Sequence, residues 1–305
     1  MRRYVVRKVA VAIPLLFLVS IAVFAMLHTG QGDPVELFVG PTAPQSVQVQ
    51  ARHELGLDQP LVTQYFLFLR RALHGDFGES ITYREPVGQL IRDRLPATLL
   101  LGGTALLLSY ALAIPLGILA AARRNTWADY AITGGALVAM AVPSFWLALL
   151  LVLLFGVHWQ LLPVSGYGSL STLVLPAVAL AAEGTGLSLR LMRSSMIEVL
   201  RQDYIRTLHA KGLNRWRILG VHAFKNALIS TITLLGLRLG MIIGGAIVIE
   251  NIFGWPGIGR LLVSSALQAD FPVVQGLTLL LAAAAIVANV TADILYAVID
   301  PRVRY

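Results

Sequence analysis

Six long runs of apolar residues divide the chain, and shorter polar stretches separate them. Each run is close to the roughly 20 residues that an α-helix needs to cross a bilayer. The pattern therefore predicts an all-α integral membrane protein with six transmembrane helices. The runs are Val9 to His28, Ala97 to Ala122, Ala131 to Val157, Thr172 to Met192, Leu228 to Ile249 and Val273 to Val298.

Positive charge alternates from one connection to the next and predicts the orientation. Lys and Arg gather at the N-terminus, at Arg123 and Arg124, between Arg190 and Lys225, and at Arg302 and Arg304. Because cytoplasmic connections are the basic ones, both termini are expected in the cytoplasm. The first run is not followed by a small-residue cleavage site, so we expect it to remain as an anchor.

The connection between the first two runs is too long for a structureless loop. Proline, which suits the first turn of a helix, opens two stretches there, Pro44 to Leu55 and Pro60 to Leu73. A third short helix is expected from Pro86, before Pro96 starts the second span. The predicted parts are a cytoplasmic tail with the first transmembrane helix (1–29), a small helical external subdomain (30–96) and a membrane core (97–305).

Composition supports a membrane protein and removes other classes. Hydrophobic residues make up 57% and charged residues 13% of the 305 residues, and the mean hydropathy is +0.74. The hydrophobic fraction is higher and the charged fraction lower than in typical soluble domains. The net charge of +8 is explained by basic cytoplasmic flanks, and the sequence has no basic stripe with interleaved aromatic residues. Nucleic-acid binding is therefore not expected.

No catalytic or metal-binding motif is recognisable. None of the three lysines follows a glycine, so the chain has no phosphate-binding loop and cannot hold ATP in that way. His53 and Glu54 are not followed by a second histidine, because Leu57 stands at its position. Cysteine is absent, which excludes disulfides and thiolate metal sites. An intramembrane serine protease built on Ser165 or Ser169 with His158 is the enzyme alternative, and the surrounding loop of small residues disfavours it.

The most informative segment is the predicted cytoplasmic loop 194–227. From Arg190, just before this loop, to Lys225 the chain carries eight Lys or Arg against two acids. Gly212 can adopt the positive φ that ends a helix, and Asn214 can cap a second short helix. Apolar residues are expected on one face of the first helix (Leu200, Tyr204, Leu208) and along an edge of the second (Leu213, Trp216, Leu219). An interfacial loop that only follows the charge rule is the alternative. Ser195 and Glu198 match a capping box, or fall inside a continuing fourth span.

Ionisable residues within the apolar runs are candidates for function, because charge at membrane depth is costly. They are Glu183, Arg238 and Asp293. We expect Glu183 and Arg238 to neutralise each other or to face a watery path, and a structural ion pair is the alternative. Gly236, Gly240 and Gly244 form a small-residue stripe, which favours close helix packing or lines a passage.

Several motifs together resemble one family, the membrane permease subunits of bacterial ABC importers for dipeptides and oligopeptides, with nickel and glutathione importers as near relatives. The similarity covers nearly the full length. The motifs are GLDQPLVTQY (Gly56 to Tyr65), GDFGES (Gly75 to Ser80), PVGQLIRDRLPATL (Pro86 to Leu99), DYIRTLHAKGL (Asp203 to Leu213), HAFKNAL (His222 to Leu228), ENIFGWPGIGRLL (Glu250 to Leu262), DFPVVQG (Asp270 to Gly276) and DPR (Asp300 to Arg302).

The resemblance implies a non-catalytic permease in a bacterial cytoplasmic membrane, paired with a second homologous permease. Two cytoplasmic ATPases would bind ATP and Mg, so no cofactor is expected in this chain, and an external peptide-binding protein would deliver cargo. The implied ATPase-coupling residues are His209, Ala210, Lys211, Gly212, Leu213, Asn214, Arg215 and Trp216. The implied docking residues for the binding protein are Asp76, Phe77, Trp255 and Pro256.

The resemblance has one departure and leaves alternatives. Arg206, Thr207 and Leu208 stand where the broader importer signature has Glu-Ala-Ala. Glu183 and Arg238 lie outside the family pattern, whereas Asp293 belongs to it; with Gly240 they are our candidates for a translocation path. Haem, glutathione or a nickel chelate are alternative cargoes. An ion-coupled carrier using Glu183, Arg238 and Asp293 is the alternative of another class.

Overall fold

Helices make up most of the computed structural model, which describes residues 2–29, 35, 44–54 and 58–299. An isolated antiparallel bridge joins Glu79 and Pro86. The helices are α1 (Arg2–Thr29), α3 (Gln45–Glu54), α4 (Leu61–Leu73), α5 (Val87–Ala122), α6 (Trp127–Ala141), α7 (Ser144–Leu151), the π-helix η1 (Val152–His158), α8 (Leu170–Leu200), α9 (Asp203–Ala210), α10 (Arg215–Arg217), the π-helix η2 (Ile218–Ala223), α11 (Phe224–Ile252), α12 (Ile258–Leu267) and α13 (Phe271–Ile299).

Length and composition let three helices in the described part of the chain cross a bilayer. They are α5, α8 and residues 271–292 of α13, and α6 with α7 and η1 gives a fourth if this bent pair counts as one span. Helices α1 and α11 contain two further predicted runs, the first and the fifth. The prediction of an all-helical, multi-pass chain agrees with this structure. The count of six spans stays a prediction.

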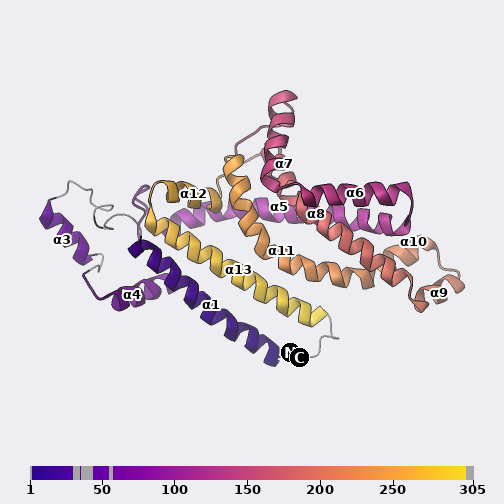
Figure 1. The fold of residues 1–305 in the computed structure, drawn as a ribbon, viewed down its shortest axis with the longest axis horizontal. Coiled ribbons are helices and arrows are strands. Elements are labelled where there is room, and N and C mark those ends of the chain that lie inside the picture. Colours follow the sequence, from indigo (N-terminus) through magenta and orange to yellow (C-terminus); the bar gives the residue numbers. More distant parts are fainter. Residues whose placement is uncertain (1, 30–34, 36–43, 55–57, 300–305) are drawn as a thin grey trace.

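Helix α8 lies at the centre of the bundle and packs closely on its neighbours. A Cβ added at Gly117 of α5 would lie 2.8 Å from the Met192 side chain of α8. A Cβ at Gly186 of α8 would collide with the Ala136 carbonyl of α6. Figure 1 shows α1 and α13 side by side, α3 and α4 at one end, and α9 and α10 at the other.

The second predicted run does not begin at Pro96. Helix α5 continues through Pro96 and Pro115, so the separate third helix expected from Pro86 is wrong. Residues on both sides of Pro96 are held by packing. Val87 and Ile91 belong to an apolar cluster with α12 and α13, and Leu101 to a cluster with α8 and α11. This packing keeps the helix continuous although proline removes one backbone hydrogen bond.

The third predicted run is broken instead of straight. Helix α6 ends at Ala141, α7 starts at Ser144, and the two directions differ by 102°. Val142 has φ −83° and ψ 120°, the extended conformation that a following proline imposes. Pro143 therefore acts as a helix breaker at this position, and α7 projects away from the bundle (Figure 1).

Candidate functional site

The segment that connects α8 to α11 has the predicted glycine break. Gly212 has φ +77°, and an added Cβ would have no atom within 4 Å. The side chain of Asn214 accepts a hydrogen bond of 2.9 Å from the backbone N–H of Trp216. Both predictions, the positive φ and the cap, are confirmed. Ser195 and Glu198 lie inside α8, which ends at Leu200, so they form no cap.

The second short helix differs from the prediction. Helix α10 has only three residues and continues without a break through η2 into α11. The segment beyond Asn214 is thus the beginning of a long helical body. Its expected apolar edge is also incomplete, because Trp216 is 68% exposed whereas Leu219 is 4% exposed. The Trp216 side chain therefore faces away from the protein.

Helix α9 is held against the rest of the molecule by its apolar face. Ile205 is buried in a cluster with Met196 of α8 and Ile218 of η2, and Tyr204 and Leu208 pack at its edge. Tyr204 and Leu208 therefore pack as predicted, whereas Leu200 is the last residue of α8 and the buried residue of α9 is Ile205. The Tyr204 hydroxyl donates to the carbonyl of His222 at 3.3 Å and accepts from Nδ2 of Asn226 at 2.7 Å. These contacts connect α9 to both η2 and α11.

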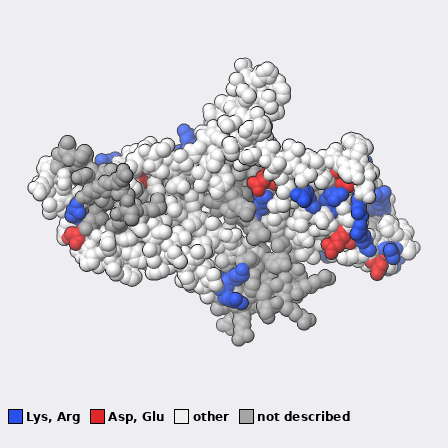
Figure 2. Space-filling view, in the orientation of Figure 1, with Lys and Arg blue, Asp and Glu red and all other residues white. Residues whose placement is uncertain are grey.

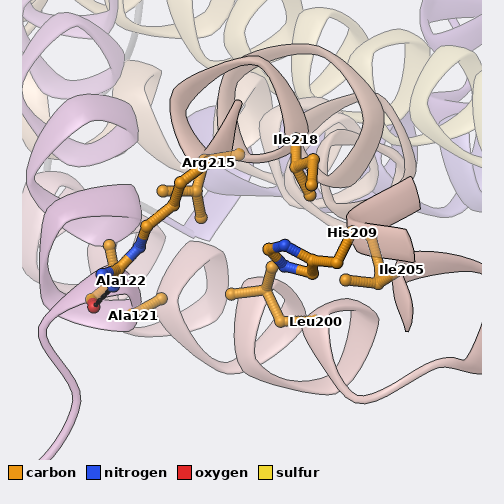
Figure 3. A pocket seen from close by; sticks show the side chains of 8 residues that line it. Ala121, Ala122, Leu200, Ile205, His209, Arg215 and Ile218 are labelled. Atoms are coloured by element: carbon orange, nitrogen blue, oxygen red, sulfur yellow. Dashed lines mark hydrogen bonds between the residues drawn. The ribbon is translucent and has the colours of Figure 1, made fainter. Parts of the chain in front are cut away.

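A pocket of about 400 Å³ lies between this segment and the end of α5. In Figure 3 the side chains of Leu200, Ile205, His209 and Ile218 converge on the pocket, and Arg215 extends along it to Ala122. Nη2 of Arg215 donates a 2.7 Å hydrogen bond to the Ala122 carbonyl. Because Ala122 is the last residue of α5, Arg215 connects the segment to that helix directly.

A second contact near this end joins α6 to α8. Asp129 is buried and accepts from Nε and Nη2 of Arg193 at 2.6 and 2.7 Å. Asn125, with φ +62°, donates its backbone N–H to the same carboxylate at 3.0 Å. Sequence reasoning missed this pair. The available signal was an acid placed immediately before an apolar run.

Charge is gathered at this end of the molecule. On the face drawn in Figure 2, Lys and Arg are most frequent over the region that carries α9 and α10, and only a few lie elsewhere on that face. Of the expected coupling residues, His209, Ala210, Lys211, Gly212, Asn214, Arg215 and Trp216 are exposed and Leu213 is half-buried. The segment therefore offers a basic, accessible surface.

An ion pair lies in the middle of the bundle. Nη2 of Arg238 in α11 donates to Oε1 of Glu183 in α8 at 3.2 Å, and their side chains are 11% and 56% exposed. The structure thus brings together two residues that the sequence suggested as partners. Gly240 lies in α11 and Asp293 in α13, but their surroundings fall outside the described residues, as does the DPR motif.

At the C-terminal end of α11, away from α10 and η2, the carboxylate of Glu250 is completely buried. Its Oε1 accepts from the Thr98 hydroxyl of α5 at 2.6 Å, and its Oε2 accepts from the backbone N–H of Arg260 at 3.0 Å. The Thr98 hydroxyl in turn accepts from the N–H of Ile258 at 2.9 Å. A Cβ at Gly257 would collide with the carboxylate. Glu250 thus determines how the loop after α11 returns to start α12.

A second buried carboxylate organises the segment before α5. Asp270 accepts from the Ser80 hydroxyl at 2.5 Å and from the backbone N–H groups of Ile81 and Thr82 at 3.2 and 3.1 Å. It immediately precedes α13, so it joins that helix to the GDFGES motif. Sequence reasoning placed Glu250 and Asp270 in motifs but gave them no role.

The expected docking residues do not form one exposed surface. Trp255 is 1% exposed, and its indole N–H donates to the Ala97 carbonyl at 2.9 Å. Phe77 packs in the cluster of Val87 and against Gly276. Asp76 is exposed and Pro256 is half-buried. The expectation of a docking contact through the Trp255 side chain is therefore corrected to a structural role.

The fold and the site indicate a multi-pass membrane protein of the transporter class. The supporting features are the apolar helices, the basic segment broken by glycine and the ion pair within the bundle. The described residues contain no cluster of His, Cys, Asp or Glu that could hold a metal ion. The chain belongs to the family of binding-protein-dependent transport system inner membrane components, which it matches over residues 113–305, and residues 1–102 match the N-terminal part of the membrane component of such systems.

Relatives of full length support the same assignment. A peptide transport system permease protein of Brucella abortus (strain 2308) is 43% identical over all of both chains. The oligopeptide transport system permease protein AppB of Bacillus subtilis is 40% identical, also over all of both chains. The dipeptide transport system permease protein DppB of Escherichia coli K12 is 37% identical over all of this chain and 99% of its own. The resemblance to ABC importer permeases and the multi-pass location in a bacterial cytoplasmic membrane are confirmed.

Proposed function

We propose that the chain is the permease subunit through which an ATP-driven ABC importer moves dipeptides or oligopeptides into the cell. The observation that carries this proposal is 37–43% identity over the full length to proteins named as peptide, dipeptide or oligopeptide permeases. Nickel, glutathione and haem importers of the same general design stay the alternatives for cargo. The permease itself catalyses no reaction.

The partners follow from the importer design. A second homologous permease would complete the passage, and an external peptide-binding protein would deliver the cargo. Two cytoplasmic ATPases would bind ATP and Mg, so this chain needs no cofactor of its own. In this proposal the chain spans the bilayer six times, and both termini lie in the cytoplasm on the same side as α9 and α10.

The ATPases would act on the exposed residues from His209 to Trp216. Movement of this segment can reach two parts of the bundle. Arg215 is bonded to the end of α5, and α10 is continuous with α11, which carries Arg238 in its middle. A push on the segment would therefore be transmitted through a continuous helix instead of a flexible connection.

Loaded binding protein would act at the opposite end. Asp76 is exposed there on the segment organised by Asp270, and Pro256 is half-buried on the loop organised by Glu250. The packed side chains of Trp255 and Phe77 would support these loops from the protein interior. Because both loops are pinned to α5, α11 and α13 by buried hydrogen bonds, contact with them would be transmitted to the spans.

Substitution of Gly212 tests the coupling. Valine is strained at φ +77°, whereas asparagine tolerates this region, so Gly212→Val is paired with Gly212→Asn. No atom lies within 4 Å of the added Cβ, so any effect arises from the backbone. We expect Gly212→Val to abolish the stimulation of ATPase activity by loaded binding protein, with assembly of the complex intact and with Gly212→Asn retaining most of it.

The measurement uses the complete importer in proteoliposomes, with labelled peptide supplied only on the side of the binding protein. Normal stimulation in Gly212→Val would reject the coupling role. Uptake driven by an ion gradient with the permease chains alone would support the ion-coupled carrier instead. Uptake that requires ATP, ATPases and binding protein supports the importer.

A further inference from the structure

Polar side chains gather around the Glu183–Arg238 ion pair in the interior of the bundle. Ser109 of α5 and Ser188 of α8 are 4% and 0% exposed. Ser109 and Arg238 both lie next to Gly184, because a Cβ added there would lie 3.0 Å from Oγ of Ser109 and 3.8 Å from Nη1 of Arg238. The absence of a side chain at Gly184 therefore leaves room for both groups beside α8.

Tyr110 belongs to the same cluster. It follows Ser109 in α5, and its hydroxyl lies near Ser188 and Arg238 without making a hydrogen bond to either. The cluster is thus formed by three helices, α5, α8 and α11. We call Ser109, Tyr110, Glu183, Ser188 and Arg238 the interior polar cluster.

Four polar atoms of this cluster have no hydrogen-bond partner among the described residues. They are Oγ of Ser109, the Tyr110 hydroxyl, Oγ of Ser188 and Nε of Arg238. Only two other buried side-chain atoms in the described residues are in that state, in Thr231 and Ser265. An unpaired buried polar atom costs about 1–3 kcal/mol. Such a concentration is costly for the fold alone and indicates that the cluster serves a ligand.

The ion pair itself is loose on the side of Glu183. Only one contact of 3.2 Å is made, whereas Asp129 and Arg193 make two contacts of 2.6 and 2.7 Å. The Glu183 side chain is 56% exposed although it lies near the middle of α8. A carboxylate at that depth does not face hydrocarbon. The face of α8 that carries Glu183 therefore meets water or another polar surface.

We propose that the interior polar cluster binds the two charged ends of a dipeptide, the shortest cargo of the proposed import, during its passage through the membrane. The guanidinium of Arg238 takes the terminal carboxylate, which its planar fork of donors fits. The Glu183 carboxylate takes the terminal ammonium. The unpartnered hydroxyls donate to the bound carboxylate or accept from the guanidinium. This inference rests on the proposed peptide import.

The balance of ion pairs favours weak binding, so that a bound peptide can be released. A bound peptide exchanges one internal ion pair for two ion pairs with the ligand, so neither Glu183 nor Arg238 is left buried without a counter-charge. The net gain is small, because the internal pair compensates both charges before the peptide arrives. Conduction requires binding that is favourable enough to enter and weak enough to leave. An empty site with an unpaired arginine would instead hold a carboxylate tightly.

The test compares one peptide in three forms: free, C-terminally amidated and N-terminally acetylated. The complete importer is reconstituted in proteoliposomes, and ATP-dependent uptake is measured with binding protein saturated by each peptide, its affinity for each form having been measured separately. We expect Arg238→Gln to slow uptake of the free peptide about tenfold, the value of one charge-assisted contact, with the amidated peptide changed less than twofold. Glu183→Gln is expected to act in the same way on the free amine against the acetylated form.

Two further variants keep the test decisive. Tyr110→Phe removes only an unpartnered hydroxyl, so it does not disturb folding, and we expect it to slow the free peptide about fivefold and to spare the amidated one. Asp129→Asn, in the ion pair between α6 and α8, should slow all three forms equally. If Arg238→Gln and Tyr110→Phe slow the free and amidated peptides equally or not at all, the inference is overturned. Failure of the unsubstituted complex to take up peptide with ATP rejects the proposed function itself.

Discussion

Glu250 and Asp270 illustrate how a buried carboxylate is stabilised without a cation. Glu250 has the Thr98 hydroxyl and the Arg260 N–H as donors, and Asp270 has the Ser80 hydroxyl and two N–H groups. Each joins a helix end to residues far away in sequence. Glycine at position 257 leaves room for the Glu250 carboxylate. These residues therefore determine the geometry of the loops that the binding protein would contact.

Glu250→Ala should lower stability, because it leaves the Thr98 hydroxyl and the Arg260 N–H without an acceptor. We expect a loss of about 2–4 kcal/mol. Glu250→Gln retains an acceptor oxygen and nearly the same shape, so it should lose less. The measurement is thermal unfolding of the purified chain or complex in detergent. Equal melting temperatures for the alanine variant and the unsubstituted protein would show that this hydrogen-bond network contributes nothing.

At the scale of elements, apolar runs predicted the long helices well. Helices α5, α8 and α13 contain three of the runs, and Gly212 and Asn214 have the roles that their residue types suggest. Prolines were the weak point. Pro96, Pro115 and Pro176 lie inside helices, whereas Pro143 breaks one. The difference depends on tertiary packing on both sides of the residue, which local sequence does not contain.

The interior contacts could not be predicted for a related reason. Glu250 and Thr98 are 152 residues apart in sequence, so no local spacing connects them. The burial of Trp255 likewise depends on the carbonyl of Ala97 in a distant helix. Glu183 and Arg238 were identifiable only because each is an isolated charge within an apolar run. A charged residue that interrupts an apolar run can be recognised in the sequence. A contact between residues far apart in sequence cannot, because neither residue departs from the pattern around it.

The Asp129–Arg193 pair should fix α6 on α8. Asp129→Asn removes the charge of the buried partner, and we expect it to cost about 1–3 kcal/mol, reduced by the partial exposure of Arg193. In a double-mutant cycle, adding Arg193→Gln to Asp129→Asn should cost little more than the first substitution. Thermal unfolding of the four proteins provides the measurement. Additive losses would show that the two side chains do not stabilise each other.

For the whole molecule, the main question is whether α6, α7 and η1 together cross the bilayer. Their 102° bend fits either a broken span or a loop that enters and leaves on one side. Helices α5 and α8 run in the same direction, because Ser109 lies next to Gly184 and Gly117 next to Met192. The chain between them therefore returns from the end of α5 that Arg215 contacts to the opposite end of the bundle, as the six-span prediction requires.

The chain has no cysteine, so single cysteines can report the side of the membrane directly. With six spans, cysteine at Thr126 or Trp216 should react with a membrane-impermeant maleimide only from the cytoplasmic side. Cysteine at Asp76 or Tyr167 should react only from outside. All four residues are exposed. Reaction of the Thr126 and Tyr167 positions from the same side would exclude six spans.

The π-helix η2 determines how α10 is rotated about the helix axis relative to α11. A π turn holds one residue more than an α turn, and one residue corresponds to about 100° of rotation and 1.5 Å of rise. Gly220 lies within η2 and has no side chain, so its deletion would remove no side-chain contact. Without it, α10 would rotate about the helix axis and present Arg215 and Trp216 in a new direction. The length of this segment, and not only its chemistry, thus fixes which partner surface α10 can fit.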